Sequence, residues 1–116
     1  MDASDLKART KAIALEAIRI SETLPRNRQA DVLGRQFLRS ATSVAANYRA
    51  ACRARSTNDF ISKLGIVEEE ADETLLWIEL LVEAGILPNA RVQALYEECE
   101  QILRMVVASI KTARNK

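Results

Sequence analysis

The chain contains very few residues that end a helix or form a turn. Of its 116 residues, only 3 are Gly and 2 are Pro. Sandwiches, barrels and doubly wound α/β folds need a turn about every ten residues. The sequence therefore argues against those folds and predicts a few long elements. Apolar residues recur at steps of three and four throughout, which indicates that these elements are helices.

Three interruptions divide the periodic segments. The first is Pro25, the second is the capping sequence that begins at Ser56, and the third runs from Gly85 to Pro88. We therefore predict helices at about residues 4–24, 27–54, 57–84 and 88–113. Because short connections make successive helices antiparallel, the expected fold is an all-α, up-down-up-down four-helix bundle. Residues 1–116 would form a single domain.

The chain contains no histidine, the commonest general base and metal ligand. The carboxylate run at residues 68–73 lacks the histidines that complete di-metal sites in bundles. We therefore expect no enzymatic activity, metal or cofactor. The two cysteines form no CxxC pair, the N-terminus is acidic rather than signal-like, and no apolar run is long enough to span a membrane. These features predict a cytoplasmic protein.

Positive and negative charges occupy different halves of the sequence. Residues 1–66 hold 12 Lys+Arg and 6 Asp+Glu, a net charge of +6, and residues 67–116 hold 5 and 10, a net charge of −5. In the second helix an all-arginine row lies opposite the apolar stripe: Arg28, Arg35, Arg39, Arg49 and Arg53. Guanidinium groups favour acceptors that offer two oxygens at once, such as phosphate or carboxylate. The row is either a binding surface for RNA or DNA, or a solvated face paired with carboxylates of this protein.

The third helix has a second, partly apolar face in addition to its core stripe. Its members are Ile66, Glu69, Glu70, Glu73, Leu76, Trp77 and Leu80. Scattered surface apolar residues are common, but a bundle helix buried on one side does not need such a face. We favour a subunit interface anchored by Trp77, with the glutamates facing arginines of a neighbouring copy. Contacts of this kind can close a ring.

Small polar residues lie between the two faces of the second helix. Ser40, Ser43 and Asn47 follow one another at helical spacing. A serine nucleophile needs a neighbouring base, and the sequence offers none. These residues are therefore expected to provide polar packing between helices rather than catalysis.

The same region carries a resemblance to a known family. The pattern Arg-Ser-x-x-Ser-x-x-x-Asn runs from Arg39 to Asn47, within the segment 34–47. With segments 56–60, 64–75 and 81–87, it resembles the bacterial four-helix bundle protein family. That family includes proteins encoded in intervening sequences of 23S ribosomal RNA genes and accessory variability proteins of diversity-generating retroelements. The similarity extends over residues 6–112.

The resemblance implies a ring-shaped homopentamer without known catalysis. Retroelement members of the family bind nucleic acid through a basic surface and associate with a reverse transcriptase. Many relatives continue the Asn with Ile-Ala-Glu-Gly, whereas Tyr48-Arg49-Ala50-Ala51 follows Asn47 here, which marks a subgroup. The leading expectation is a homo-oligomer that binds nucleic acid through the arginine row. The alternative is an oligomeric scaffold that recognises a protein, such as a reverse transcriptase, and binds no nucleic acid itself.

Overall fold

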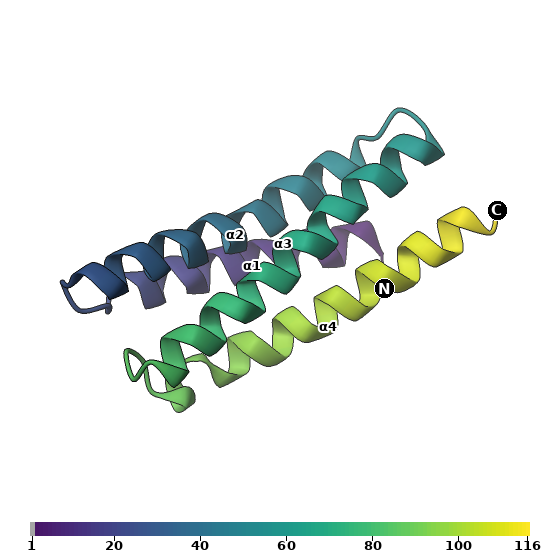
Figure 1. Cartoon of the computed structure of the whole chain (residues 1–116). Coiled ribbons are helices and arrows are strands. Elements are labelled where there is room, and N and C mark those ends of the chain that lie inside the picture. Colours follow the sequence, from purple (N-terminus) through teal and green to yellow (C-terminus); the bar gives the residue numbers. More distant parts are fainter. Residues whose placement is uncertain (1) are drawn as a thin grey trace.

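The computed structural model describes residues 2–116 and confirms the predicted all-α four-helix bundle (Figure 1). Its helices are α1 (Ala3–Ser21), α2 (Arg28–Cys52), α3 (Thr57–Glu83) and α4 (Asn89–Arg114). The molecule is elongated, with extents of 48 × 21 × 20 Å. None of the described helices is long and apolar enough to cross a membrane.

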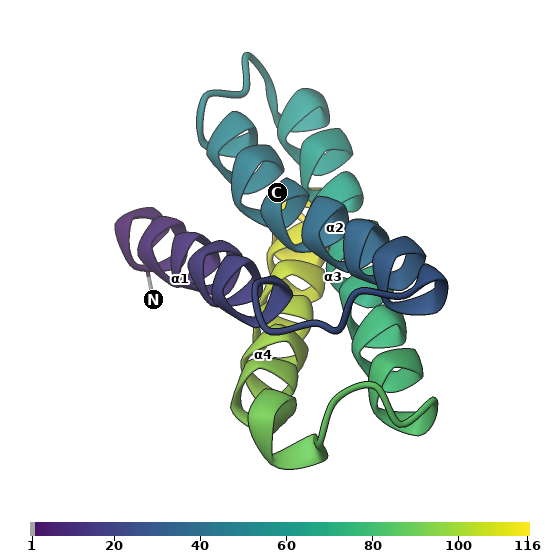
Figure 2. The ribbon, with the colours of Figure 1, turned by 90° about the vertical axis from the view of Figure 1, so that its left-hand side faces the viewer.

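Each helix packs against the next one in the sequence, and α1 also touches α4 (Figures 1 and 2). The contact between α2 and α3 is the most extensive, and that between α1 and α4 is the smallest. Among the described residues, no Cα atoms of α1 and α3, or of α2 and α4, lie within 8 Å of each other. Therefore α1 and α3 are diagonal partners, and their outer faces point in opposite directions.

Side chains cap three of the helices at their N-termini. An oxygen of Asp2, Asn27 or Ser56 accepts a hydrogen bond from the backbone N–H three residues later, at 2.9–3.0 Å. Each bond satisfies an N–H that has no partner inside its helix. At the third cap, the Asp59 carboxylate also accepts the backbone N–H of Arg55 at 3.1 Å. The polar residues in the connections thus determine where these helices begin.

Pro25 and Gly85 determine where two of the helices, α1 and α3, end. Helix α1 ends at Ser21 rather than at residue 24, because Leu24 precedes Pro25 and is disfavoured from the helical conformation. Helix α3 ends in a Schellman motif, in which Gly85 has φ +76°. There the N–H of Gly85 donates to the Val82 carbonyl at 3.0 Å and that of Ile86 to the Leu81 carbonyl at 2.9 Å.

The core is built from one apolar stripe on each helix. Its largest fully buried side chains include Phe37, Ile13, Ile20, Leu64, Ile78, Leu81 and Ile102. In the connection between α1 and α2, Leu24 packs closely on Gly34 of α2. A Cβ atom on Gly34 would lie 2.6 Å from Cδ1 of Leu24, so the missing side chain permits this approach.

Candidate nucleic-acid interface

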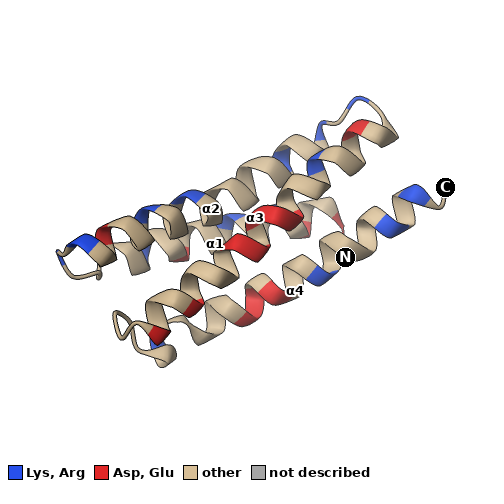
Figure 3. Ribbon diagram, in the orientation of Figure 1, with Lys and Arg blue, Asp and Glu red and all other residues tan. Residues whose placement is uncertain are grey.

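The arginine row predicted for α2 lies on the outer surface of the bundle, and Figure 3 shows the positive residues along this helix. All five members are exposed: Arg28, Arg35, Arg39, Arg49 and Arg53. Within residues 2–116, Arg28, Arg49 and Arg53 form no ion pair. Arg35 pairs with Asp31 of the same helix at 3.0 Å.

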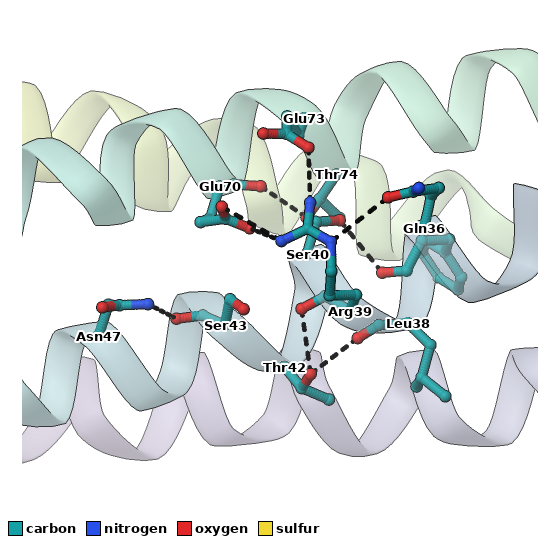
Figure 4. Close-up of polar contacts among 11 residues, drawn as sticks. Gln36, Leu38, Arg39, Ser40, Thr42, Ser43, Asn47, Glu70, Glu73 and Thr74 are labelled. Carbon is teal, nitrogen blue, oxygen red and sulfur yellow. Dashed lines mark hydrogen bonds and ion pairs between the residues drawn. The ribbon is translucent and has the colours of Figure 1, made fainter.

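Arg39 differs from the other members because it is held by α3 of the same chain (Figure 4). One guanidinium nitrogen donates to Glu70 at 3.1 Å and another donates to Glu73 at 2.7 Å. The Nε atom donates to Gln36 at 3.3 Å. The neutralised Arg39 divides the row into a pair near the start of α2 and a pair near its end.

The second face of α3 contains an exposed part and a covered part. Ile66, Leu76 and Leu80 are 41%, 46% and 38% exposed, and Glu69 is exposed beside them. Trp77 is only partly exposed and packs against the core. Its Nε1–H is buried and finds no acceptor within the described part of the chain.

The glutamates of this face do not all point outward. Glu70 and Glu73, expected to face arginines of a neighbouring copy, bind Arg39 of their own chain. The extensive packing of α3 on α2 brings these side chains together. The exposed part of the face therefore consists mainly of the three aliphatic residues and Glu69.

The small polar residues of α2 have different roles. Ser40 is fully buried, and its Oγ accepts a hydrogen bond of 2.9 Å from the Thr74 hydroxyl of α3 (Figure 4). In contrast, the Asn47 amide donates within α2 to the Ser43 carbonyl at 2.9 Å. Thus Ser40 joins two helices, whereas the hydrogen bond between Asn47 and Ser43 stays within one helix. The sequence pattern does not single out Thr74.

A polar cluster joins α1 to α4 across their small contact. Arg9 donates from Nε to Glu98 at 2.8 Å and from Nη2 to Gln101 at 3.0 Å. The hydrogen bond from Arg9 lowers the pKa of the Glu98 carboxyl group. Elsewhere, the Tyr96 hydroxyl of α4 donates to Glu79 of α3 at 2.6 Å, which raises the pKa of Tyr96 to about 12. These contacts stabilise the helix arrangement and form no reactive pair.

Two hollows on the surface of the bundle bring cations from different helices together. The first, between the start of α1 and the end of α2, is lined by Ser4, Lys7, Ala8, Lys11, Arg49, Cys52 and Arg53. The second, at the α2–α3 connection, is lined by Ala46, Arg49, Ala50, Arg53, Arg55, Asp59 and Lys63. Lys63 pairs with Asp59 at 2.7 Å. The periodicity of a single helix does not single out Lys7 or Lys11. These lysines come close to Arg49 and Arg53 only because α1 packs antiparallel to α2.

The carboxylates and thiols do not gather into a metal site in the part of the chain that the structure describes. No group of three or more Cys, Asp or Glu side chains there could hold a metal ion, so the carboxylate run on α3 does not converge. Cys52 is exposed and Cys99 is buried, and both are free thiols. Burial raises the pKa of the Cys99 thiol to about 12.

Comparison with known proteins gave two kinds of match. The model of the 23S rRNA-intervening sequence protein family matches residues 4–108. A crystal structure of a protein of unknown function from the S23 ribosomal protein family of Bacteroides thetaiotaomicron VPI-5482 aligns with a TM-score of 0.88. The two sequences are 31% identical, and the alignment covers 96% of this chain and 99% of that one. A search of curated proteins gave no significant match.

Proposed function

Since the chain belongs to the 23S rRNA-intervening sequence protein family, we propose that it is a non-enzymatic homo-oligomer that binds nucleic acid. Its subunits form a ring, which the family resemblance suggests is a pentamer. The observation that carries the proposal is the set of arginines on α2 that remain without a partner in the described chain: Arg28, Arg49 and Arg53. Its two free thiols fit a reducing, cytoplasmic location.

The chemistry of this surface favours the nucleic-acid backbone over the bases. Arginine binds phosphate oxygens in a bidentate manner, and clustered cations form the electrostatic footprint of nucleic-acid proteins. Base stacking needs an exposed aromatic ring. The aromatic residue nearest to this row in the sequence of α2, Tyr48, is only 5% exposed. Binding is therefore expected to depend weakly on sequence and strongly on salt.

The exposed part of α3 supports self-association. Ile66, Leu76 and Leu80 follow the long axis of the helix, and each leaves more than a third of its surface in solvent. Two copies joined face to face through this patch would bring acidic residues together, including Glu69 of each copy. Like charges in close contact repel each other. The partner that fits this face of α3 is a second copy of the chain that binds through a surface other than its own α3.

Helix α1 supplies such a surface on the opposite side of the molecule. Its Leu15 and Ile18 are 43% and 41% exposed, and the adjacent Arg19 is also exposed. Because α1 and α3 are diagonal partners, a contact between α1 of one copy and α3 of the next is head-to-tail. Head-to-tail contacts produce closed rings when the rotation between copies closes.

Binding of nucleic acid can be tested by removing the arginine charges. We expect the variant Arg28→Gln, Arg35→Gln, Arg49→Gln, Arg53→Gln to lose binding to RNA and DNA in a filter assay at two salt concentrations. Its mass in solution should remain that of the wild type. Arg39→Gln serves as the control, because Glu70 and Glu73 already neutralise this residue. Undiminished binding by the fourfold variant would refute the proposal.

Self-association can be tested by changing the exposed part of α3. Leu76→Glu and Leu80→Glu should shift the mass measured by light scattering toward that of a monomer, because charge would replace the apolar contact. Val32→Glu is the matched control, since Val32 is a 54% exposed apolar residue on α2. If both α3 variants keep the wild-type mass, the subunit contact lies elsewhere.

The pairing of Arg39 supports a second candidate function. Because Arg39 binds Glu70 and Glu73, part of the row helps to join α2 to α3 rather than remaining open to a ligand. The protein would then be an oligomeric scaffold for a protein partner such as a reverse transcriptase. A wild-type protein that binds neither RNA nor DNA at low salt, but retains its oligomeric mass, would favour this alternative.

A further inference from the structure

We infer that the nucleic-acid backbone binds in a groove between two helices, where Lys7 and Lys11 of α1 face Arg49 and Arg53 of α2. These four residues are called the basic groove below. The inference rests on the proposed nucleic-acid binding and gives it a location. It also adds two lysines from α1 and gives the arginines near the start of α2 a smaller part in binding.

The lining of the groove is suited to an extended chain of anions. Lys7 and Lys11 are one helical turn apart, as are Arg49 and Arg53, which spaces each pair by about 6 Å along its helix. The remaining lining residues, Ser4, Ala8 and Cys52, are small. No carboxylate lines the groove, and Asp2 and Asp5 line a neighbouring hollow instead. The groove is thus lined only by small side chains and by positively charged ones.

None of the four cations has a charged partner among residues 2–116. Arg49 lies in the last turn of α2, where a positive charge stabilises the helix through its dipole. That explanation does not extend to Lys7 and Lys11, which lie in the first half of α1. Gathering four like charges opposes folding through mutual repulsion. A polyanionic ligand would relieve this repulsion.

The basic groove continues around the end of the bundle. Arg49 and Arg53 also line the second hollow, together with Arg55 and Lys63. Cations from α1, α2 and α3 therefore follow one another across this end. The hollow at the other end of α2 is lined by two carboxylates, Glu22 and Asp31, beside three cations, Arg26, Arg28 and Arg35. The two ends of the arginine row thus differ in net charge, and the end near Arg53 is the more positive.

The location can be tested by comparing two charge-matched variants. We would measure the binding of fluorescein-labelled oligouridine by anisotropy over a range of salt concentrations. Lys7→Gln, Lys11→Gln should weaken binding by about tenfold and lower the slope of log K against log salt by about 1.4, because two phosphate contacts to a single strand are lost. Arg28→Gln, Arg35→Gln removes the same charge, yet should lower the affinity and the slope by much less, because both residues lie outside the basic groove and beside the carboxylates of Glu22 and Asp31. Circular dichroism and light scattering would check that both variants fold and assemble.

The outcomes separate the location from the function. If the wild type binds oligouridine and only the Arg28, Arg35 variant is weakened, the basic groove is wrong and the proposed function stands. If the wild type fails to bind at any salt concentration, both fail. If poly-glutamate binds at the basic groove and oligouridine does not, the ligand is an acidic protein segment, which overturns the inference.

Discussion

At the scale of single residues, burial makes the two thiols chemically different. The reactive form of cysteine is the thiolate, and burial raises the pKa of Cys99 to about 12. Cys52 is exposed at the end of α2. We predict that a thiol reagent at pH 8 modifies Cys52 rapidly and Cys99 only after unfolding. Cys52→Ser and Cys99→Ser identify which group reacts, and rapid labelling of Cys99 in the folded protein would contradict the prediction.

The pair Arg9 and Glu98 should make stability depend on pH in the acid range. The side chains are 20% and 32% exposed, so the solvent screens part of their interaction. Glu98→Gln should lower the free energy of unfolding at pH 7 by about 1 kcal/mol. The pKa of Glu98 is lower in the folded chain, so its contribution is full above the unfolded pKa, about 4.3, and is lost as pH falls through the folded value.

Urea denaturation of the wild type and Glu98→Gln at several pH values measures this contribution. The stability difference should be constant near neutral pH and shrink below about pH 4. Glu97→Gln is the control, because Glu97 is an exposed neighbour on α4 whose carboxylate accepts a hydrogen bond from Gln93 and forms no ion pair in the described chain. A stability difference that persists at the lowest pH would show that Glu98 acts through packing rather than through charge.

The positions of individual polar partners were the least predictable part of the molecule. The sequence places Arg39 on the outer row and Glu70 and Glu73 on α3, but their contact depends on the axial register of two helices. Periodicity gives the angle of a residue around its own helix and contains no information about that register. For the same reason, the sequence does not show that Trp77 packs against the core rather than lying fully exposed.

At the scale of elements, α3 contains a glycine that its surroundings do not require. A Cβ atom on Gly65 would have no neighbouring atom within 4 Å, and glycine inside a helix is about 1 kcal/mol less favourable than alanine. Gly65→Ala should raise the free energy of unfolding by 0.5 to ~1 kcal/mol. Gly85→Ala should lower it, because Gly85 has φ +76°. Chemical denaturation measures both changes, and destabilisation by Gly65→Ala would place position 65 inside a subunit contact.

The elements themselves were largely predictable. Steps of three and four between apolar residues indicate which face of each helix is buried, and Phe37, Leu64 and Ile102 all lie in the core. The cap at Ser56 was predictable, because its side chain can act alone. The end of α1 was placed too late, because the apolar stripe continues to Leu24 although the helix stops at Ser21.

At the scale of the whole molecule, α1 is attached to the bundle less extensively than α3. It contacts α2 along its length but α4 only over a small area, whereas α3 packs extensively on both of its neighbours. Local opening requires less free energy where fewer buried contacts are broken. We predict that the amides of α1 exchange with deuterium faster than those in the middle of α3. Equal protection in both helices would instead indicate that the bundle opens as one unit.

The candidate site depends on how the helices pack together more than on any single helix. The arginine row could be read from α2 alone, and the net charge of each half of the sequence indicated where positive residues collect. The basic groove could not be predicted from one helix, because Lys7 and Lys11 approach Arg49 and Arg53 only when α1 packs antiparallel on α2. Sequence periodicity therefore predicted half of the cations and the folded arrangement supplied the rest.

The placement of both chain ends affects how the protein should be labelled. One hollow is lined by Asp2 and Lys116 together with Ser56 of the α2–α3 connection, so both ends lie at the end of the bundle that holds the basic groove. An affinity tag or fluorophore fused to either terminus would sit beside the groove, and a polyhistidine tag would add charge there at low pH. A probe attached at Asn89 or Glu22, at the opposite end, would leave this surface unchanged.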